Sequence, residues 1–163
     1  MTTENKATSN SKIQIRKILV PIDGSEYSIN AAKYASRIAK DENAELFCIH
    51  VITPRIPYGY ATSTAASAAS TTDQYHEDII NMIETWFEKV RDIANNEGIS
   101  DVKTETFIDV KSVIGSIIDY ASRKDIDLIV IGTKGRTGLN RFLMGSVANG
   151  VVQHAHCPVL LVR

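Results

Sequence analysis

The fold is decided by residues 127–146, which read DLIVIGTKGRTGLNRFLMGS. The segment opens with the apolar run 128–131, which is typical of a strand buried on both faces of a sheet. It continues as a loop, because four of the nine glycines of the chain lie between Gly132 and Gly145. Gly145 and Ser146 then precede a segment with helical periodicity and are expected to open a helix. A strand, a connecting loop and a helix in this order are typical of α/β proteins.

The same alternation of strand and helix extends over the rest of the chain. Short runs rich in β-branched residues recur, and each of the first four is followed by a helical pattern. Such alternation indicates βαβ units and a parallel sheet, so we expect an α/β fold. The five predicted strands are 17–23, 45–52, 103–110, 127–132 and 158–162.

The helices between these strands are predicted from their caps and apolar faces. The second helix is expected to open at Thr71, where Gln74 completes a capping-box pattern, and to stop at Gly98. The preceding segment, 53–72, is long for a connection and contains the tract ATSTAASAASTT. It is either a mobile connector or a lid over a site at the end of the second strand. The other helices are expected to begin at Ser25, Ser112 and Ser146.

Composition places the chain among single-domain globular proteins. Its 163 residues include 18 Lys and Arg and 19 Asp and Glu, so a broad basic surface for nucleic acid is not expected. No apolar stretch approaches the ~20 residues that span a bilayer, so no membrane segment is expected. Residues 1–12 are polar and are expected to form a disordered tail before one domain at 13–163. The start of the chain has no apolar signal-peptide core, and both cysteines lie in strand-like runs, which favours a cytoplasmic location.

The glycine-rich segment 132–145, called the glycine loop below, has the features of a polyphosphate site. Glycines let backbone N–H groups approach an anion closely, and a helix N-terminus adds unpaired N–H groups and a positive dipole end. Ser146 adds a hydroxyl, and Lys134, Arg136 and Arg141 add positive charge. The loop is not a Walker loop or a dinucleotide fingerprint, because neither G-x4-G-K-[ST] nor a G-x-G-x-x-G after the first strand occurs. The alternative is that these glycines only shape loops and helix ends.

The spacing of the glycines favours a nucleotide site over glycines that only shape loops. Gly132, Gly135, Gly145 and Ser146 spell G-x2-G-x9-G-[ST], which resembles the nucleotide-binding motif of the universal stress protein (UspA-like) family. The first strand, KILVPIDGS, is similar to the opening of that family, and the quoted segment with the residues after it is similar to its closing third. The similarity covers residues 16–163. It implies a Rossmann-like fold with a five-stranded parallel sheet in the order 3-2-1-4-5 and helices on both faces.

Members of this family that carry the motif bind ATP, and the resemblance implies ATP, ADP or AMP as the ligand. Asp23 would lie near the ribose, and Val51 would offer backbone groups to the adenine edge. Mg²⁺ or Mn²⁺ would arrive with the phosphates rather than at a metal site of the protein. Ala148 departs from the pattern, because a hydroxyl can occur at this position. The implied binding residues are Pro21, Ile22, Asp23, Val51, Ile131, Gly132, Lys134, Gly135, Gly145, Ser146 and Val147.

Several polar residues also have simpler interpretations. Asp23 either caps the first helix or contacts a ligand. His50 ends a strand run and is expected to be a wall residue rather than a catalytic group. His154 and His156 look like a metal pair but lack the i,i+4 spacing, so structural or surface roles are favoured. Packed thiols are expected at Cys48 and Cys157.

The sequence favours a binding module over an enzyme. No residue of the predicted site is an obvious general base for a γ-phosphate, and no pair of carboxylates suits two metal ions. We therefore expect a regulatory ATP-binding protein without catalytic residues. A slow ATPase or phosphotransferase using the same site and a nucleotide-free interaction protein are the alternatives. The apolar last strand, 158–162, is expected to lie at a sheet edge and to pair with a second copy, as relatives commonly do, giving a homodimer.

Overall fold

The structure is a computed structural model that describes residues 14–53, 65–109, 112–136 and 144–163. Strands and helices alternate along these segments. The disordered tail predicted at 1–12 lies outside the described residues. In chain order the elements are β1 (Lys17–Pro21), α1 (Glu26–Glu42), β2 (Glu45–Ile52), α2 (Ala65–Asn96), β3 (Val102–Ile108), α3 (Val113–Arg123), β4 (Leu128–Gly132), α4 (Ser146–His154) and β5 (Val159–Val162).

The strands form one parallel sheet in the order β3-β2-β1-β4-β5. β1 lies at its centre, with Ile18 opposite both Leu46 of β2 and Leu128 of β4. The predicted α/β fold and strand order are therefore confirmed. The strands differ from the prediction only at their ends. β1 stops at Pro21, before the predicted end at residue 23, because the chain turns at Gly24, whose φ is +79°.

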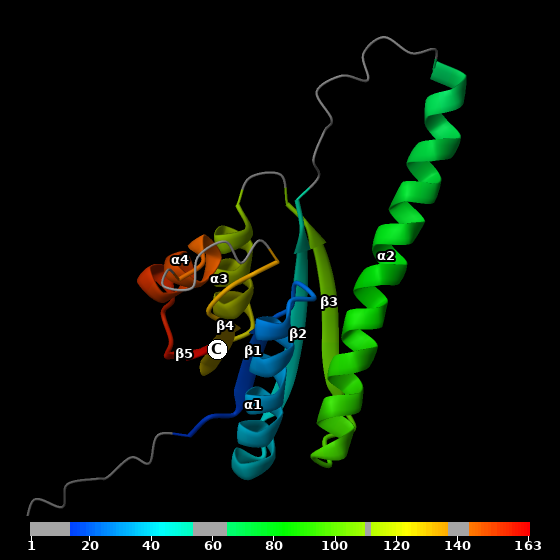
Figure 1. Ribbon diagram of the computed structural model, residues 1–163. Coiled ribbons are helices and arrows are strands. Elements are labelled where there is room, and N and C mark those ends of the chain that lie inside the picture. Colours follow the sequence, from blue (N-terminus) through cyan, green and yellow to red (C-terminus); the bar gives the residue numbers. More distant parts are fainter. Residues whose placement is uncertain (1–13, 54–64, 110–111, 137–143) are drawn as a thin grey trace, which may run out of the picture.

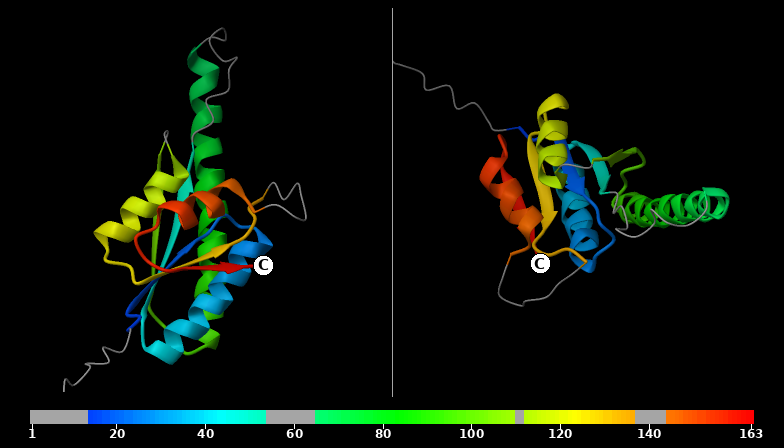
Figure 2. Two further views of the ribbon diagram at one scale, coloured as in Figure 1. Left: turned by 90° about the vertical axis from the view of Figure 1, so that its left-hand side faces the viewer. Right: turned by 90° about the horizontal axis from the view of Figure 1, so that it is seen from above.

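The helices cover both faces of the sheet (Figures 1 and 2). α1 and α2 pack on the face that carries Ile18 and Val20, and α3 and α4 pack on the face that carries Leu19. Successive residues of a strand point to opposite faces, so β1 contributes to two separate cores. This explains why the central strands are apolar at nearly every position rather than alternating with polar residues.

α1 begins as predicted, and it lies close to the sheet. Ser25 is its N-cap, and the Ser25 side chain accepts a hydrogen bond from Ser28 N. The side of α1 that faces the sheet consists mostly of small residues, which allow the helix axis to approach the strands. Its buried residues are Ser28, Ile29, Ala31, Ala32, Ala35, Ser36 and Ala39.

α2 begins earlier than predicted. Its first residue is Ala65 rather than Thr71, so that prediction was wrong by more than a turn. The tract 65–70, predicted as part of a linker, is rich in alanine, which has the highest helix propensity of all residues. Of the predicted linker 53–72, residues 54–64 lie outside the described residues and 65–72 belong to α2. The helix extends well beyond the sheet (Figure 1).

α3 and α4 both begin where the sequence predicts. Ser112 caps α3 and accepts a hydrogen bond from Gly115 N at 3.0 Å. Gly145 is the N-cap of α4, which starts at Ser146. The two helices are neighbours on the sheet, and Gly150 of α4 faces Ile114 of α3 across their contact.

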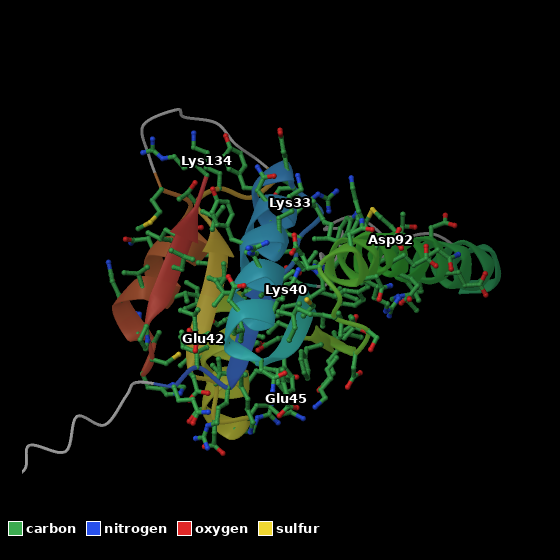
Figure 3. The ribbon with its side chains drawn as sticks, turned by 90° about the horizontal axis from the view of Figure 1, so that it is seen from below. Lys33, Lys40, Glu42, Glu45, Asp92 and Lys134 are labelled. Carbon is green, nitrogen blue, oxygen red and sulfur yellow. The ribbon has the colours of Figure 1, made fainter. Side chains whose placement is uncertain are left out.

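Charged side chains lie on the outer surfaces of the helices (Figure 3). Lys33 and Lys40 on α1 and Asp92 on α2 are all exposed. Lys40 Nζ lies 3.5 Å from Glu97 Oε2 and links α1 to the end of α2, a surface ion pair of about 0–1 kcal/mol. In the segments that the structure describes, every helix is too short or too polar to cross a membrane.

Candidate functional site

A cavity of about 260 Å³ lies at the carboxyl ends of β1 and β4. From this pair of strands the chain continues to opposite sides of the sheet, so the loops that follow them separate and leave a crevice. In open α/β sheets, ligands bind at such a reversal of strand order. The structure brings all eleven predicted binding residues to this cavity. They are Pro21, Ile22, Asp23, Val51, Ile131, Gly132, Lys134, Gly135, Gly145, Ser146 and Val147.

Backbone contacts fix the start of the glycine loop after β4. Thr133 N donates to the Val162 carbonyl at 2.7 Å, and the Thr133 carbonyl accepts from Gly145 N at 2.8 Å. The glycine loop and the start of α4 are therefore joined directly. A Cβ added at Gly132 would lie 2.7 Å from the carbonyl carbon of Tyr27, so only glycine permits the close approach of this loop to α1.

Asp23 connects the turn after β1 to the glycine loop. Its Oδ1 accepts hydrogen bonds from Ser25 N at 3.0 Å and Ser25 Oγ at 2.6 Å, and its Oδ2 accepts from Arg136 N at 3.2 Å. A Cβ added at Gly135 would lie 2.8 Å from Asp23 Oδ2, so glycine leaves room for the carboxylate. Asp23 thus supports the cap residue of α1 rather than capping the helix itself. Its contact with a ligand stays a prediction.

α4 presents an open N-terminus to the cavity. Its N-cap, Gly145, provides no side-chain hydrogen bond, and Asn149 N donates to the Gly145 carbonyl at 2.9 Å. The N–H groups of Ser146 and Val147 precede this bond and have no partner within the helix. Thr133 Oγ1 is buried and has no hydrogen-bond partner among the described residues. The unsatisfied N–H groups of Ser146 and Val147 and the helix dipole fit an anionic ligand, whereas Thr133 is not among the residues that line the cavity.

Two cations of the glycine loop lie against aromatic rings. Lys134 Nζ is 5.9 Å from the ring centre of Tyr27, alongside α1 (Figure 3). Arg136 Cζ is 5.5 Å from the ring centre of Trp86 on α2. An aromatic face attracts a cation through its quadrupole without neutralising the charge, so the loop stays positive. Arg141, a third predicted cation, lies outside the described residues.

One wall of the cavity is apolar. It is formed by Ile49 and Val51 of β2, by Ile131 of β4 and by Val113 and Ile117 of α3. Two of the strand residues in this wall are almost fully buried, since Val51 is 8% and Ile131 5% exposed. Binding sites for small molecules typically combine such a wall with a few convergent polar groups. The cavity can therefore receive a flat aromatic group on the wall and an anion at the glycine loop.

Sequence reasoning left several cavity residues out of the predicted set. His50, named as a wall residue, does line the cavity, and its Nδ1 lies 2.6 Å from the Ile22 carbonyl. Burial lowers the pKa of the imidazole, which favours its neutral form, and Nδ1 is the donor of this hydrogen bond because a carbonyl oxygen only accepts. Strand alternation could have indicated Ile49, which faces the same side as Val51. The α3 residues depend on helix packing, for which the sequence has no signal. The added lining residues are Ser28, Ile49, His50, Val113, Ile117, Arg136 and Ala148.

The remaining candidate residues lie away from the cavity. Cys48 is a packed thiol as predicted, and burial raises its pKa to about 12. Cys157 is half-buried, and burial raises the pKa of its thiol as well. His154 is exposed, with Nδ1 2.8 Å from the Gly150 carbonyl. Within the described ranges, no three His, Cys, Asp or Glu side chains group together as metal ligands would. A hollow of about 590 Å³ between the end of β3 and α3 contains none of the predicted residues.

Comparison with known proteins identifies the family. The model of the universal stress protein family matches residues 14–163. The chain belongs to the universal stress protein family. A universal stress protein of Methanocaldococcus jannaschii is 35% identical over 98% of this chain and 88% of its own length. A second universal stress protein, from Bacillus subtilis, is 32% identical over 90% of this chain and 98% of its own length.

Solved universal stress proteins share the architecture. UspA from Lactobacillus plantarum is 26% identical and matches with a TM-score of 0.73, covering 92% of this chain and 99% of that chain. A universal stress protein in complex with cAMP matches with a TM-score of 0.65, and one from Archaeoglobus fulgidus in complex with dAMP with 0.62. Both are 22% identical to this chain. The cAMP complex covers 92% of this chain and 98% of its own, and the dAMP complex covers 93% of this chain and 99% of its own. These matches confirm the Rossmann-like fold.

Proposed function

We propose that this universal stress protein binds ATP, or its products ADP or AMP, and acts as a regulatory module in the cytoplasm. The observation that carries the proposal is the convergence of all eleven predicted residues, from three strands, the glycine loop and the start of α4, on one cavity. Adenine as the base is supported by the solved universal stress proteins that are complexes with cAMP and dAMP.

The glycine loop and α4 would hold the phosphates. The unpaired N–H groups of Ser146 and Val147 and the Ser146 hydroxyl are donors at the positive end of a helix dipole. Lys134 adds a cation that is not neutralised by its contact with Tyr27. These groups attract an anion without requiring the recognition of any particular base.

The wall of the cavity would hold the nucleoside. The apolar wall around Val51 and Ile131 suits the face of an adenine ring, and backbone groups at the end of β2 would face its edge. Asp23 accepts three hydrogen bonds within the protein, and a carboxylate has about four acceptor positions. The remaining position can accept a ribose hydroxyl.

A divalent cation would enter with the nucleotide. Asp23 is the only carboxylate among the cavity residues that the structure describes, and it is already engaged by Ser25 and Arg136. We therefore expect Mg²⁺ or Mn²⁺ to be held by phosphate oxygens and water. A stoichiometric metal in the nucleotide-free protein would contradict this arrangement.

The proposed role is a sensor rather than an ATPase. Asp23 accepts three hydrogen bonds within the protein and is assigned to the ribose, and His50 bonds the Ile22 carbonyl through Nδ1, which leaves His50 Nε2 as the one nitrogen of this pair that could act as a base. A general base must be free to reach the proton of an attacking water. We expect ATP turnover far below the typical enzyme rate of about 10 per second. Turnover above about 1 per second would instead favour the alternative, an ATPase or phosphotransferase.

A second copy of the chain is the proposed protein partner. β5 lies at one edge of the sheet and consists of the uncharged run VLLV, in which Leu161 is 38% exposed. The opposite edge strand, β3, carries Lys103 and Glu105, and charged residues discourage edge pairing. We therefore propose a homodimer through β5, the strand predicted at 158–162.

Isothermal titration calorimetry with ATP, GTP and CTP tests the proposed binding. The protein should bind ATP, and it should bind GTP and CTP more weakly because the phosphate contacts are shared and the adenine contacts are not. Equal affinity for all three nucleotides would contradict recognition of adenine. The absence of heat with millimolar ATP would contradict nucleotide binding altogether.

A further inference from the structure

Trp86 of α2 lies against both loops that border the cavity. Its ring centre is 5.5 Å from Arg136 Cζ in the glycine loop and 5.2 Å from the ring centre of His50, edge-on. In the turn after β1, a Cβ added at Gly24 would lie 2.2 Å from Trp86 Cε2. None of the described α2 residues lines the cavity, yet the indole of Trp86 contacts three of the segments that do: the turn after β1, β2 and the glycine loop.

Arg136 is held from two sides. Its backbone N–H donates to Asp23 Oδ2 at 3.2 Å, and its guanidinium lies over the indole. Within the described part of the chain, the guanidinium forms no ion pair with a carboxylate. The aromatic face therefore positions the side chain while leaving its charge available to an anion.

We propose that Trp86 is a positioning residue of the nucleotide site, which holds Arg136 and thereby fixes residues 132–136 against α2. The inference rests on the proposed nucleotide binding. A loop that is already fixed in its binding position loses less conformational freedom when the ligand arrives, so its affinity is higher. The same contact couples the site to α2, because displacement of Arg136 changes the support of that helix.

The simpler interpretation is that Trp86 only packs α2 on the core, as its neighbour Phe87 does. Trp86 is half-buried, whereas Phe87 is 3% exposed and lies in the core beneath α1 and α2. Trp86 also packs against this core, so Phe87→Leu is the matched control: it weakens the packing of the same helix without removing the aromatic face over which Arg136 lies. Trp86→Phe keeps an aromatic face for Arg136, and Trp86→Leu removes it.

Amide hydrogen exchange in the nucleotide-free protein tests the contact itself. In Trp86→Leu, the amides of Gly135 and Arg136 should exchange about three- to tenfold faster, the loss expected for one cation–π contact. Trp86→Phe should recover most of the protection, and Phe87→Leu should leave these amides as in the wild type. Unchanged exchange in Trp86→Leu, or equal acceleration in Phe87→Leu, would overturn the proposal.

Calorimetry with ATP tests the consequence for binding. Trp86→Leu and Arg136→Gln should each weaken ATP binding about three- to tenfold, and the double variant should lose no more than the larger single effect. Losses that multiply in the double variant would overturn the proposal, because the two residues would then act independently. Faster loop exchange in Trp86→Leu, in a protein that fails to bind ATP, would support the contact and refute the proposed function.

Discussion

Single residues shape the cavity through contacts that exclude any larger side chain. Gly132 touches the backbone of Tyr27, Gly135 borders the carboxylate of Asp23, and Gly24 rests on Trp86. At Gly24 two requirements coincide, because its φ of +79° disfavours every L side chain and the indole fills the space where a Cβ would lie. Gly132 and Gly135 of the motif thus have a structural reason beside any contact with a ligand, whereas a Cβ at Gly145 would lie no closer than 3.4 Å to a neighbouring atom.

Gly24→Ala is expected to lower the free energy of unfolding by about 2–4 kcal/mol, the sum of backbone strain and displacement of Trp86. Gly98→Ala is the matched control, since Gly98 has a φ of +89° but no heavy atom of the described residues within 4 Å of an added Cβ. Gly98→Ala should lower the free energy of unfolding only by the backbone strain, about 1–2 kcal/mol. Urea denaturation of both variants measures the difference, and equal losses would mean that the indole gives way freely.

Ser146→Ala removes one hydroxyl donor from the proposed phosphate site. A hydrogen bond to a charged group contributes about 1.5–3 kcal/mol, so ATP affinity should fall roughly ten- to a hundredfold. Stability should change by less than about 0.5 kcal/mol, because Ser146 is exposed. Ser122→Ala, on the exposed surface of α3, should leave both quantities unchanged in calorimetry and thermal unfolding. ATP affinity within twofold of the wild type in Ser146→Ala would remove this hydroxyl from the site.

At the scale of elements, the sequence predicts the order and type of strands and helices better than their first and last residues. The starts of α1, α3 and α4 follow from Ser25, Ser112 and the Gly145-Ser146 pair, because capping is a local interaction that the sequence contains in full. The start of α2 was missed, because an Ala/Ser/Thr tract has the composition of a linker while its alanines favour helix. In this tract the composition predicts a linker and the helix propensity of alanine predicts a helix, and the structure has a helix.

The packing of α4 on α3 depends on Gly150. A Cβ at this position would lie 2.4 Å from Ile114 Cδ1, so Gly150→Ala should lower the free energy of unfolding by about 0.5–2 kcal/mol despite better helix propensity. Ile114→Val removes that methyl group and should recover part of the loss in the double variant. Gly115→Ala, whose added Cβ meets atoms no closer than 3.4 Å, should instead be neutral or stabilising by up to about 1 kcal/mol. If denaturant titrations show Gly150→Ala to be more stable than the wild type, α3 and α4 can move apart without loss of free energy of unfolding.

At the scale of the whole molecule, the position of the predicted site follows mainly from the strand order of the sheet. Strand order 3-2-1-4-5 brings the ends of β1 and β4 together, and this alone assembles Asp23 with the glycine loop. The contact of Trp86 with Arg136 could not be predicted in this way, because Trp86 belongs to no motif and its position beside Arg136 depends on the angle of α2. Sequence spacing and periodicity do not predict which side chains meet through helix packing. They do predict which side chains meet at the ends of neighbouring strands.

The proposed dimer also belongs to this scale. The wild type should have the mass of a dimer at micromolar concentration in light scattering. Leu161→Lys should shift it toward monomer, because a charge on the apolar strand opposes pairing across the β5 edge. Ile80→Lys is the control, since Ile80 is an apolar residue of α2 that is 60% exposed and lies away from β5. A monomeric wild type, or a Leu161→Lys variant that stays dimeric, would contradict the proposed interface.

The central claim is that an adenine nucleotide occupies the crevice between the loops after β1 and β4. A crystal structure of the protein grown with ATP and Mg²⁺ tests it most directly. The account predicts density for phosphates at Gly145 and Ser146, for the ribose beside Asp23, and for the adenine against the wall formed by Val51. Density for the nucleotide elsewhere on the molecule, or an empty crevice at saturating ATP, would contradict it.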